Sequence, residues 1–215
     1  MDSIELIVLG TTRVGESAVV VHTLSREHGR RGFLVRSGKK AGMTLFLPLN
    51  ILEADVVENP KSELWTLRNI HLKDGLAGVR ANLYKNTMTL FLAEVLFRTL
   101  REGMVEEGLY QWCVGALLTL DALENDFANY PVRFLLELSG ALGFRPSFDD
   151  IAPFAKTELP ALKAFLETGF GPSMLIPLNG ATRNALCEDL LQYLSFHTEI
   201  PIQVKSLAVL RELYR

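Results

Sequence analysis

The sequence has few of the residues that build disulfide or metal sites. Its two cysteines, Cys113 and Cys187, stand 74 positions apart in a chain of 215 residues and form no C-x-x-C pair. Two isolated cysteines exclude a disulfide scaffold and are typical of a reducing compartment such as the cytosol. The four histidines show no ligand spacing with each other or with cysteine, so we expect no metal site.

Long apolar runs are also absent. No run approaches the ~18 residues that span a bilayer, and the opening MDSIELIVLG has no basic flank before its apolar stretch. We therefore expect no membrane span, no secretory signal and a cytoplasmic protein. An apolar fraction of 48% with 22% charged residues predicts a folded chain of one large or two small domains.

The motifs of common catalytic sites are missing as well. The segment 37–40, S-G-K-K, resembles a phosphate-binding loop, but Phe33 stands where that motif needs glycine and Lys40 where it needs Ser or Thr. We interpret Asp149 and Asp150 as a helix cap rather than as a catalytic pair. A G-x-S-x-G sequence is absent, and we expect a protein that is not an enzyme and uses no cofactor.

The first 77 residues have the pattern of strands. Short β-branched and aromatic runs, separated by turn residues, span 4–12, 17–24, 32–37, 44–57 and 63–72. Pro48 in the fourth run predicts a sharply bent strand, because proline cannot donate to a sheet ladder. Five short strands in about 75 residues predict a small barrel. Apolar residues occupy both odd and even positions of the first strand, which point to opposite faces. One face of the strand therefore fills the barrel, and the other must be covered by another part of the protein.

After residue 75 the spacing of apolar residues changes from every second position to every third or fourth position, as in helices. The predicted helices span 78–102, 109–123, 130–144, 182–198 and 203–214, with one short helix at 160–168 in the proline-rich stretch 145–180. The fold class is therefore α+β, with a five-stranded barrel domain at 1–77 and a helical bundle domain at 78–215.

Positive charge is concentrated in residues 25–40, S-R-E-H-G-R-R-G-F-L-V-R-S-G-K-K, where six cations meet only Glu27. Residues 1–77 have a net charge of +1, whereas the remainder has −4. We expect these cations and one from the first turn to form a single rim of the barrel that binds nucleic acid. The candidate DNA-binding residues are Arg13, Arg26, Arg30, Arg31, Arg36, Lys39 and Lys40.

Two alternatives stay open for individual residues of the barrel. The basic segment could be a solvated loop without a partner, because charge runs are common. Phe33 and Phe46 are candidates for stacking on bases, although Phe33 lies inside an apolar run that is typical of a core. His22, in the middle of a predicted strand, is interpreted as a partly buried histidine satisfied by hydrogen bonds.

Residues 7–40, IVLGTTRVGESAVVVHTLSREHGRRGFLVRSGKK, resemble the opening of the bacterial recombination mediator family RecO. Its members have an Arg/Asp-x-Gly-Glu-Ser turn, here at 13–17, and a Thr-x-Glu-x-Gly motif before a basic strand, here at 25–29. The closing VKSLAVLREL at 204–213 resembles the last helix of the family. The order of barrel, long helix and helical bundle is similar too.

The resemblance implies an N-terminal OB-fold and a helical C-terminal domain. It implies that the protein binds single- and double-stranded DNA, anneals complementary strands and helps load the RecA recombinase in the RecF pathway. It also implies cooperation with RecR and contact with the tail of the single-stranded-DNA-binding protein. It also implies a nucleoid-associated location. Many members carry a four-cysteine zinc site, but only Cys187 lies in the corresponding region here, so we expect no such site. The basic loop after the third strand is shorter than in many members.

Other functions remain open from the sequence. The chain could be an adaptor whose basic barrel docks an acidic protein tail without binding DNA. An exposed apolar groove in the bundle, beside the candidate partner-docking residues Lys205 and Arg211, could also accept such a tail. An RNA-binding translation factor on the same small barrel is disfavoured by the large helical half. Reversing the charge of Arg30 and Arg31 is expected to weaken DNA binding and to leave stability within about 0.5 kcal/mol.

Overall fold

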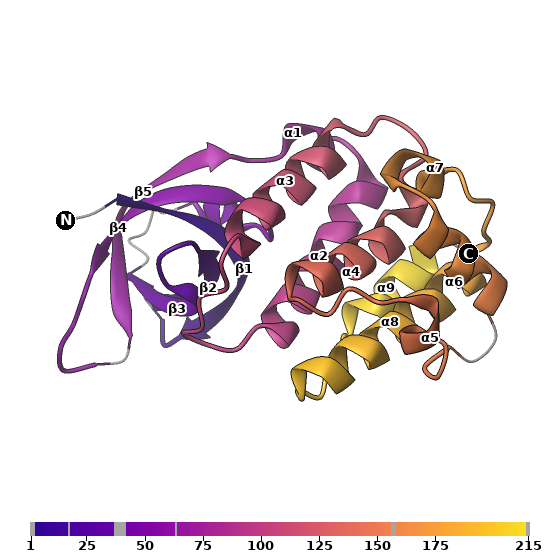
Figure 1. The fold of residues 1–215 in the computed structure, drawn as a ribbon. Coiled ribbons are helices and arrows are strands. Elements are labelled where there is room, and N and C mark those ends of the chain that lie inside the picture. Colours follow the sequence, from indigo (N-terminus) through magenta and orange to yellow (C-terminus); the bar gives the residue numbers. More distant parts are fainter. Residues whose placement is uncertain (1–2, 17, 37–41, 63, 156–157, 214–215) are drawn as a thin grey trace.

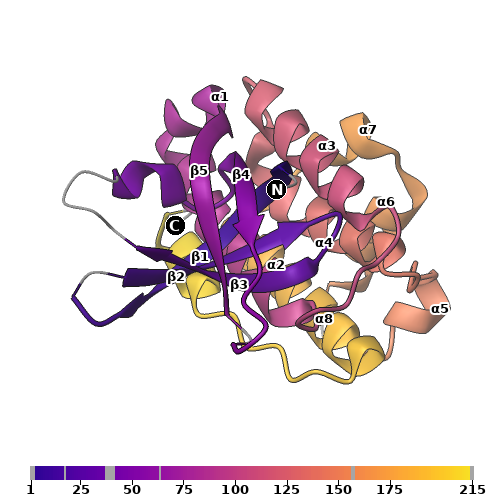
Figure 2. The same ribbon diagram turned by 90° about the vertical axis from the view of Figure 1, so that its left-hand side faces the viewer.

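A computed structural model describes residues 3–16, 18–36, 42–62, 64–155 and 158–213. A β-barrel forms one end of the molecule and a layer of helices forms the other, as Figure 1 shows. In Figure 2 the barrel faces the viewer and the helices lie behind it. The predicted order of barrel and helical bundle is confirmed.

Five strands close into a barrel in the order β1-β2-β3-β5-β4. The strands are β1 (Ser3–Val14), β2 (Ala18–Ser25), β3 (Gly29–Arg36), β4 (Ile51–Val57) and β5 (Trp65–Asp74). The pairs are antiparallel except for β3 and β5, which run parallel. A closed five-stranded barrel of this kind confirms the predicted OB-fold.

The two faces of β1 pack into two different hydrophobic cores. Leu6 and Val8 pack in the barrel interior, whereas Ile7 and Leu9 belong to the core of the helices. Because successive side chains of a strand point to opposite faces, one strand can line both cores at once. The sequence prediction that one face fills the barrel and the other is covered is therefore confirmed.

The predicted fourth strand, 44–57, is wrong in its first half. Residues Met43–Phe46 form a 3₁₀ helix, η1, and β4 begins only at Ile51. Pro48 lies in the connection, where its missing N–H breaks no ladder. Leu49 follows with a φ of 67° and is fully buried, so the chain turns sharply here before it enters the sheet.

Helices form where the apolar pattern predicts them. They are α1 (Ala77–Arg80), α2 (Leu83–Thr99), α3 (Leu109–Ala122), α4 (Tyr130–Ala141), α6 (Leu159–Glu167), α8 (Gly180–Thr198) and α9 (Ser206–Leu213). The predicted helix 78–102 is divided in two, because the Asn82 side chain accepts hydrogen bonds from the N–H groups of Tyr84 and Lys85 and begins a new helix.

Short elements fill the proline-rich stretch and the connection before α4. They are η2 (Phe127–Asn129), α5 (Phe148–Ile151) and α7 (Phe170–Met174). Ser147 caps α5 by accepting from the N–H of Asp150, whose carboxylate accepts in return from the N–H of Ser147. The interpretation as a helix cap is therefore confirmed for Asp150, whereas Asp149 lies in the first turn of α5 without a capping hydrogen bond in the described structure.

The barrel and the helices share a continuous core. Leu24, Leu49 and Ile51 from the barrel pack in the same cluster as the apolar faces of α2, α3 and α4. The predicted boundary between residues 77 and 78 falls at the start of α1, and the division into two domains stays a prediction. Within the described residues, no helix has the length and apolar character that crossing a membrane requires.

Candidate nucleic-acid interface

The cations of the barrel lie at two opposite ends of its strands. Arg36 pairs with Ala18 across β2 and β3 beside the β1–β2 turn, whereas Arg30 pairs with Leu24 beside the β2–β3 turn. Arg36 lies six positions after Arg30 along β3, which is about 20 Å at ~3.3 Å per residue. We call the two places the β1–β2 end and the β2–β3 end. The single rim predicted from the sequence is therefore wrong.

Arg30 joins the barrel to the helices. Its Nε donates to the carbonyl of Leu100 at 2.8 Å, and its guanidinium lies 3.6 Å from the Glu102 carboxylate and 4.9 Å from the centre of the Phe97 ring. Only 14% of the side chain is exposed. A guanidinium held by a carbonyl, a carboxylate and a ring is an internal tie. These contacts argue against the expectation that reversing its charge spares stability, which stays a prediction.

The backbone makes the same contact. The N–H of Gly103 donates to the carbonyl of Arg30 at 2.8 Å, and residues 30 and 102 form a parallel bridge. Gly29 has a φ of +59°, and a side chain there would meet the Met104 carbonyl at 1.9 Å. Because this contact requires glycine at position 29, the turn motif at 25–29 builds the junction of barrel and helices.

Arg31 and Arg26 have other surroundings at the β2–β3 end. Arg31 points to the opposite face of β3 from Arg30, and its guanidinium lies 3.6 Å from the centre of the Trp65 ring. Arg26 is exposed. Its guanidinium donates to the side-chain oxygen of Gln111 on α3 when the Gln111 amide is turned so that this oxygen faces Arg26. Two further cations of the basic run thus contact other parts of the chain.

Acidic residues of the helical half meet this end. The exposed segment 101–108, R-E-G-M-V-E-E-G, connects α2 and α3 and contains Glu102, Glu106 and Glu107. It runs against the β2–β3 turn through the contacts of residues 102–104. The charge of Arg30 at this end is therefore opposed by the Glu102 carboxylate of the same molecule.

The β1–β2 end keeps its positive charge exposed. Arg13 and Arg36 are both exposed, and neither makes a hydrogen bond or an ion pair within the described part of the chain. Arg13 lies on β1 next to Val14, which pairs with Ala18, the partner of Arg36. Lys39 and Lys40, which follow β3 in sequence, lie outside the described residues.

The outer face of β1, β4 and β5 has paired charges of both signs. Glu5 forms an ion pair with Lys73 and accepts from the hydroxyl of Tyr110 at 3.2 Å, and these groups lower the pKa of its carboxyl. Asp55 stands opposite Arg68 in the register of β4 and β5. A face with alternating charges attracts a polyanion weakly, so it is a poor candidate for phosphate contacts.

The aromatic candidates from the sequence are buried. Phe33 is 0% exposed and Phe46 is 6% exposed, so neither presents a ring on which a base can stack. Sequence reasoning missed Trp65, which opens β5 and is half-buried. An aromatic residue close behind the polar run 58–63, near the start of a predicted strand, was the signal available for it.

His22 is half-buried and shares a hydrogen bond of 2.9 Å with the Thr12 hydroxyl, which confirms its interpretation as a satisfied histidine. Burial lowers its pKa, and the charge of Arg30 lowers it further. Both cysteines are free and buried, and burial raises the pKa of Cys187 to about 12. The described residues include no cluster of His, Cys, Asp and Glu that could hold a metal ion.

The predicted partner-docking residues stand at a groove that contains an acid. Arg211 forms an ion pair with Glu188, which lines a groove of about 480 Å³ between α8 and residues 202–207. Lys205 is exposed near the start of α9, where its N–H donates to Glu94. Since Glu188 already neutralises Arg211, this groove suits an acidic tail poorly, and the role of both cations stays a prediction.

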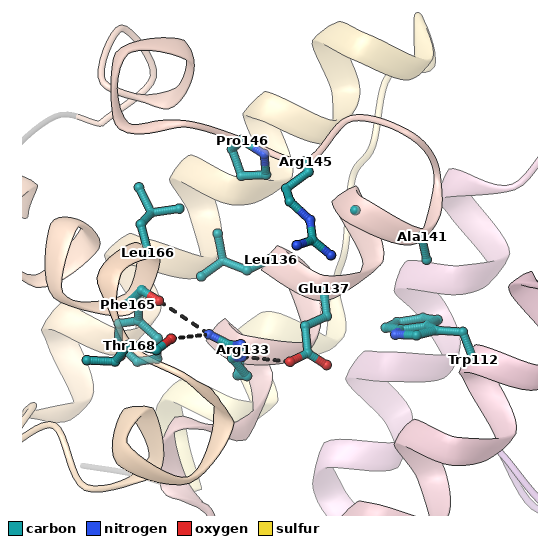
Figure 3. A pocket seen from close by; sticks show the side chains of 11 residues that line it. Trp112, Arg133, Leu136, Glu137, Ala141, Arg145, Pro146, Phe165, Leu166 and Thr168 are labelled. Atoms are coloured by element: carbon teal, nitrogen blue, oxygen red, sulfur yellow. Dashed lines mark hydrogen bonds and ion pairs between the residues drawn. The ribbon is translucent and has the colours of Figure 1, made fainter.

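A second pocket, of about 450 Å³, lies between α3, α4 and α6. Figure 3 shows Arg133 at its floor, bonded to Glu137 at 2.7 Å and to the carbonyls of Phe165 and Thr168. The Arg145 side chain points into the pocket and passes over Gly140, where an added Cβ would lie 3.3 Å from its Nε. Arg145 makes no hydrogen bond or ion pair with the described residues.

Two family models match the chain in succession. The model for "Recombination protein O N terminal" matches residues 1–76, which contain the barrel, and the model for "Recombination protein O C terminal" matches residues 80–153. The first match ends next to the last residues of β5 and the second begins in α1.

Several curated relatives carry the name DNA repair protein RecO. The one from Phocaeicola vulgatus is 32% identical over 67% of this chain, and this chain spans only 61% of its length. Those from Flavobacterium psychrophilum and Flavobacterium johnsoniae are 25% and 26% identical over 97% of both chains. With both halves of the family matched in order and a fold that agrees, the chain belongs to the RecO family of DNA repair proteins.

Proposed function

We propose that this protein binds single- and double-stranded DNA, promotes the annealing of complementary strands and helps load the RecA recombinase during repair in the RecF pathway. The exposed pair Arg13 and Arg36 at the β1–β2 end is the observation that carries the proposal for DNA contact. OB-type barrels bind oligonucleotides with strands 2 and 3 and with the loop between strands 1 and 2, which is where this pair lies. Lys39 and Lys40 follow Arg36 in sequence and extend the same cationic set.

Annealing needs no catalytic group in this proposal. Two DNA strands repel each other through their phosphates, and cations that neutralise phosphate lower the free energy of bringing the strands together. Arginine suits this role, because its planar guanidinium binds a phosphate with two hydrogen bonds. We therefore propose a protein that is not an enzyme and that works without a cofactor.

The remaining parts of the proposal concern partners and place. Membership in the family supports cooperation with RecR, contact with the tail of the single-stranded-DNA-binding protein, and a cytoplasmic, nucleoid-associated location. The helical half has a net charge of −4, so it suits protein contacts better than DNA contacts.

Fluorescence anisotropy with labelled oligonucleotides across a salt series tests DNA binding. The logarithm of the affinity should fall with the logarithm of the salt concentration, with a slope of about 0.7 per phosphate contacted on single strands and about 0.9 on duplex. Absence of binding at low salt, for the folded full-length chain, would contradict the proposal.

A second candidate function is an adaptor that docks an acidic protein tail. The pocket around Arg145 favours it, because Leu136, Phe165 and Leu166 line the same pocket while Arg133 is occupied by Glu137. An acidic tail that ends in an apolar residue could place its carboxylate on Arg145 and its side chain on these apolar residues.

Titration of a labelled acidic peptide tests this candidate, with Arg145→Glu as the variant and Lys163→Glu, an exposed position on α6, as the matched control. Loss of binding in the first variant alone supports docking at the pocket. Equal binding by both variants would exclude Arg145 as the contact.

A further inference from the structure

We propose that the β2–β3 end of the barrel is a stacking platform for one unpaired base of single-stranded nucleic acid, formed by Trp65, Arg31 and His28. The proposal rests on the DNA binding proposed above. It adds a second site, whose Arg31 lies five positions, or about 17 Å, along β3 from Arg36. It assigns to that site the distinction between single strands and duplex.

Three flat groups lie together at this end. The Arg31 guanidinium stands 3.6 Å from the centre of the Trp65 ring, a separation typical of direct stacking. The His28 ring meets Trp65 edge to face, with 5.3 Å between ring centres and an angle of 90°. Beneath them, Phe33 lies 6.1 Å from His28 and closes the barrel interior.

The platform rests on the barrel core, because Trp65 packs against the cluster that contains Phe33. Phe33 is 0% exposed, whereas Trp65, Arg31 and His28 are each partly exposed. The register places Trp65 opposite Phe33, at the mouth of the barrel where β5 begins. Trp65 and Arg31, near the starts of β5 and β3, and His28, in the β2–β3 turn, are therefore partly accessible from solvent.

The chemistry of the three groups suits a base. Every base has a π-face that stacks on aromatic rings and on guanidinium planes, and such stacking is tolerant of sequence. Burial lowers the pKa of His28, and the charge of Arg31 lowers it further against the opposing effect of Glu27 and Glu58, which favours the neutral ring. The platform therefore combines one cation with two neutral rings.

Its position also agrees with how such barrels bind. Trp65 directly follows the connection between β4 and β5, and OB-type barrels bind oligonucleotides with this connection as well as with strands 2 and 3. Bases in a duplex are covered on both faces by their neighbours, so only an unpaired base can enter the platform. Single strands should therefore gain a contact that duplex lacks.

The sequence offers a direct optical test, because it contains only two tryptophans. In a Trp112→Phe background, Trp65 is the sole tryptophan, and its emission reports on stacking. Titration with labelled oligothymidine should quench this emission with the same midpoint as the anisotropy change. Titration with duplex of equal length should change the anisotropy and leave the emission nearly constant.

Two variants in the otherwise unchanged chain complete the test. Trp65→Leu should weaken single-strand affinity about fivefold or more, as loss of a base–aromatic stack does, and should leave duplex affinity within twofold. Trp65→Phe keeps an aromatic face and should restore most of the single-strand affinity. Thermal melts of both variants show whether each is folded at the temperature of the titration.

The outcomes separate this proposal from the one on which it rests. Binding of single strands with unchanged Trp65 emission would overturn the platform and leave DNA binding intact. Equal weakening of single-strand and duplex binding in a folded Trp65→Leu variant would also overturn it. Absence of any binding at low salt would overturn both proposals. If Trp65→Leu does not fold, the quenching titration with Trp65 in place still tests whether a base stacks at the platform.

Discussion

Arg30 holds the barrel against the helices through a guanidinium that is almost entirely enclosed. Its hydrogen bond to Leu100 and its approach to Glu102 and Phe97 connect β3 to the end of α2. A residue of this kind contributes to stability rather than to a surface that binds ligands.

Replacing Arg30 tests that role. Arg30→Ala should lower the free energy of unfolding by about 2–3 kcal/mol, because it leaves the Leu100 carbonyl without its charged donor. Arg36→Ala, at an exposed position of the same strand, should change it by less than about 0.5 kcal/mol. Urea unfolding followed by circular dichroism measures both. Equal stability of the two variants would show that Arg30 is not a structural tie.

His22 makes stability depend on pH near neutrality. Burial and the neighbouring Arg30 hold its pKa below the ordinary 6.5, so the unfolded chain takes up a proton before the folded chain does. The stability that the neutral His22 ring contributes is therefore fully present above pH 6.5. It is lost as the pH falls from 6.5 through the lower pKa that His22 has in the folded protein.

The pH dependence of unfolding checks this assignment. The wild type should lose stability between pH 7.5 and pH 5.5, and His22→Gln should lose less over the same interval. Glu102, which opposes the effect of Arg30 on His22, remains in both proteins. An identical pH profile for the two would assign the loss to other groups, such as His28.

At the level of single elements, α9 is held by a residue of another helix. The Glu94 carboxylate on α2 accepts from the N–H groups of Lys205 and Ser206 and from the Ser206 hydroxyl at 2.6 Å. Burial alone would raise the pKa of Glu94, but these hydrogen bonds lower it below its ordinary value. The carboxylate thus caps the first turn of α9, which has no acidic residue of its own there.

Removing this cap should loosen the C-terminal helix. Glu94→Ala should destabilise the protein by about 1–2 kcal/mol and speed proteolytic cleavage near residues 200–206. Glu167→Ala, which breaks only the exposed pair with Lys163, should change stability by about 0.5 kcal/mol or less. Cleavage at equal rates in the two variants would contradict the role given to Glu94.

The elements themselves were largely predictable, and their contacts were not. Alternation and helical periodicity located four of the strands and the longer helices, because those patterns reflect burial on one or two faces. The division at Asn82 and the 3₁₀ turn before Pro48 escaped prediction, since both depend on local hydrogen bonds rather than on a period.

The candidate site shows the same limit. Composition identified the basic run. However, successive side chains of a strand point to opposite faces, so Arg30 and Arg31 lie on different faces of β3, and Arg36 lies at the far end of the strand. The acidic segment 101–108 that meets Arg30 lies some 70 positions away in sequence. Only the folded chain brings those charges together.

For the whole molecule, the shared core makes the barrel dependent on the helices. Ile7, Leu24 and Ile51 of the barrel are buried among helical side chains and would be exposed in the barrel alone. An isolated fragment of residues 1–77 should therefore lack a cooperative thermal transition, whereas the full chain should unfold in one step. A fragment that melts cooperatively at a similar temperature would show an independent domain.

Charge is distributed over the molecule in a way that favours one DNA-binding end. The β2–β3 end has its arginines tied to rings, amides and carboxylates, and the outer face of β4 and β5 has paired charges. The β1–β2 end keeps Arg13 and Arg36 exposed. Phosphate contacts on both kinds of DNA should therefore depend on this pair.

Salt-dependent anisotropy of a charge-reversal pair tests that claim most directly. Arg13→Glu with Arg36→Glu should weaken single-strand and duplex binding together and lower the salt slope by about 1.4 on single strands, for two lost phosphate contacts. The control pair, Arg68→Glu with Lys163→Glu, carries the same change in net charge at exposed positions elsewhere and should bind nearly as the wild type does. Unchanged binding by the first pair, or equal losses in both pairs, would contradict the assignment of the β1–β2 end as the DNA contact.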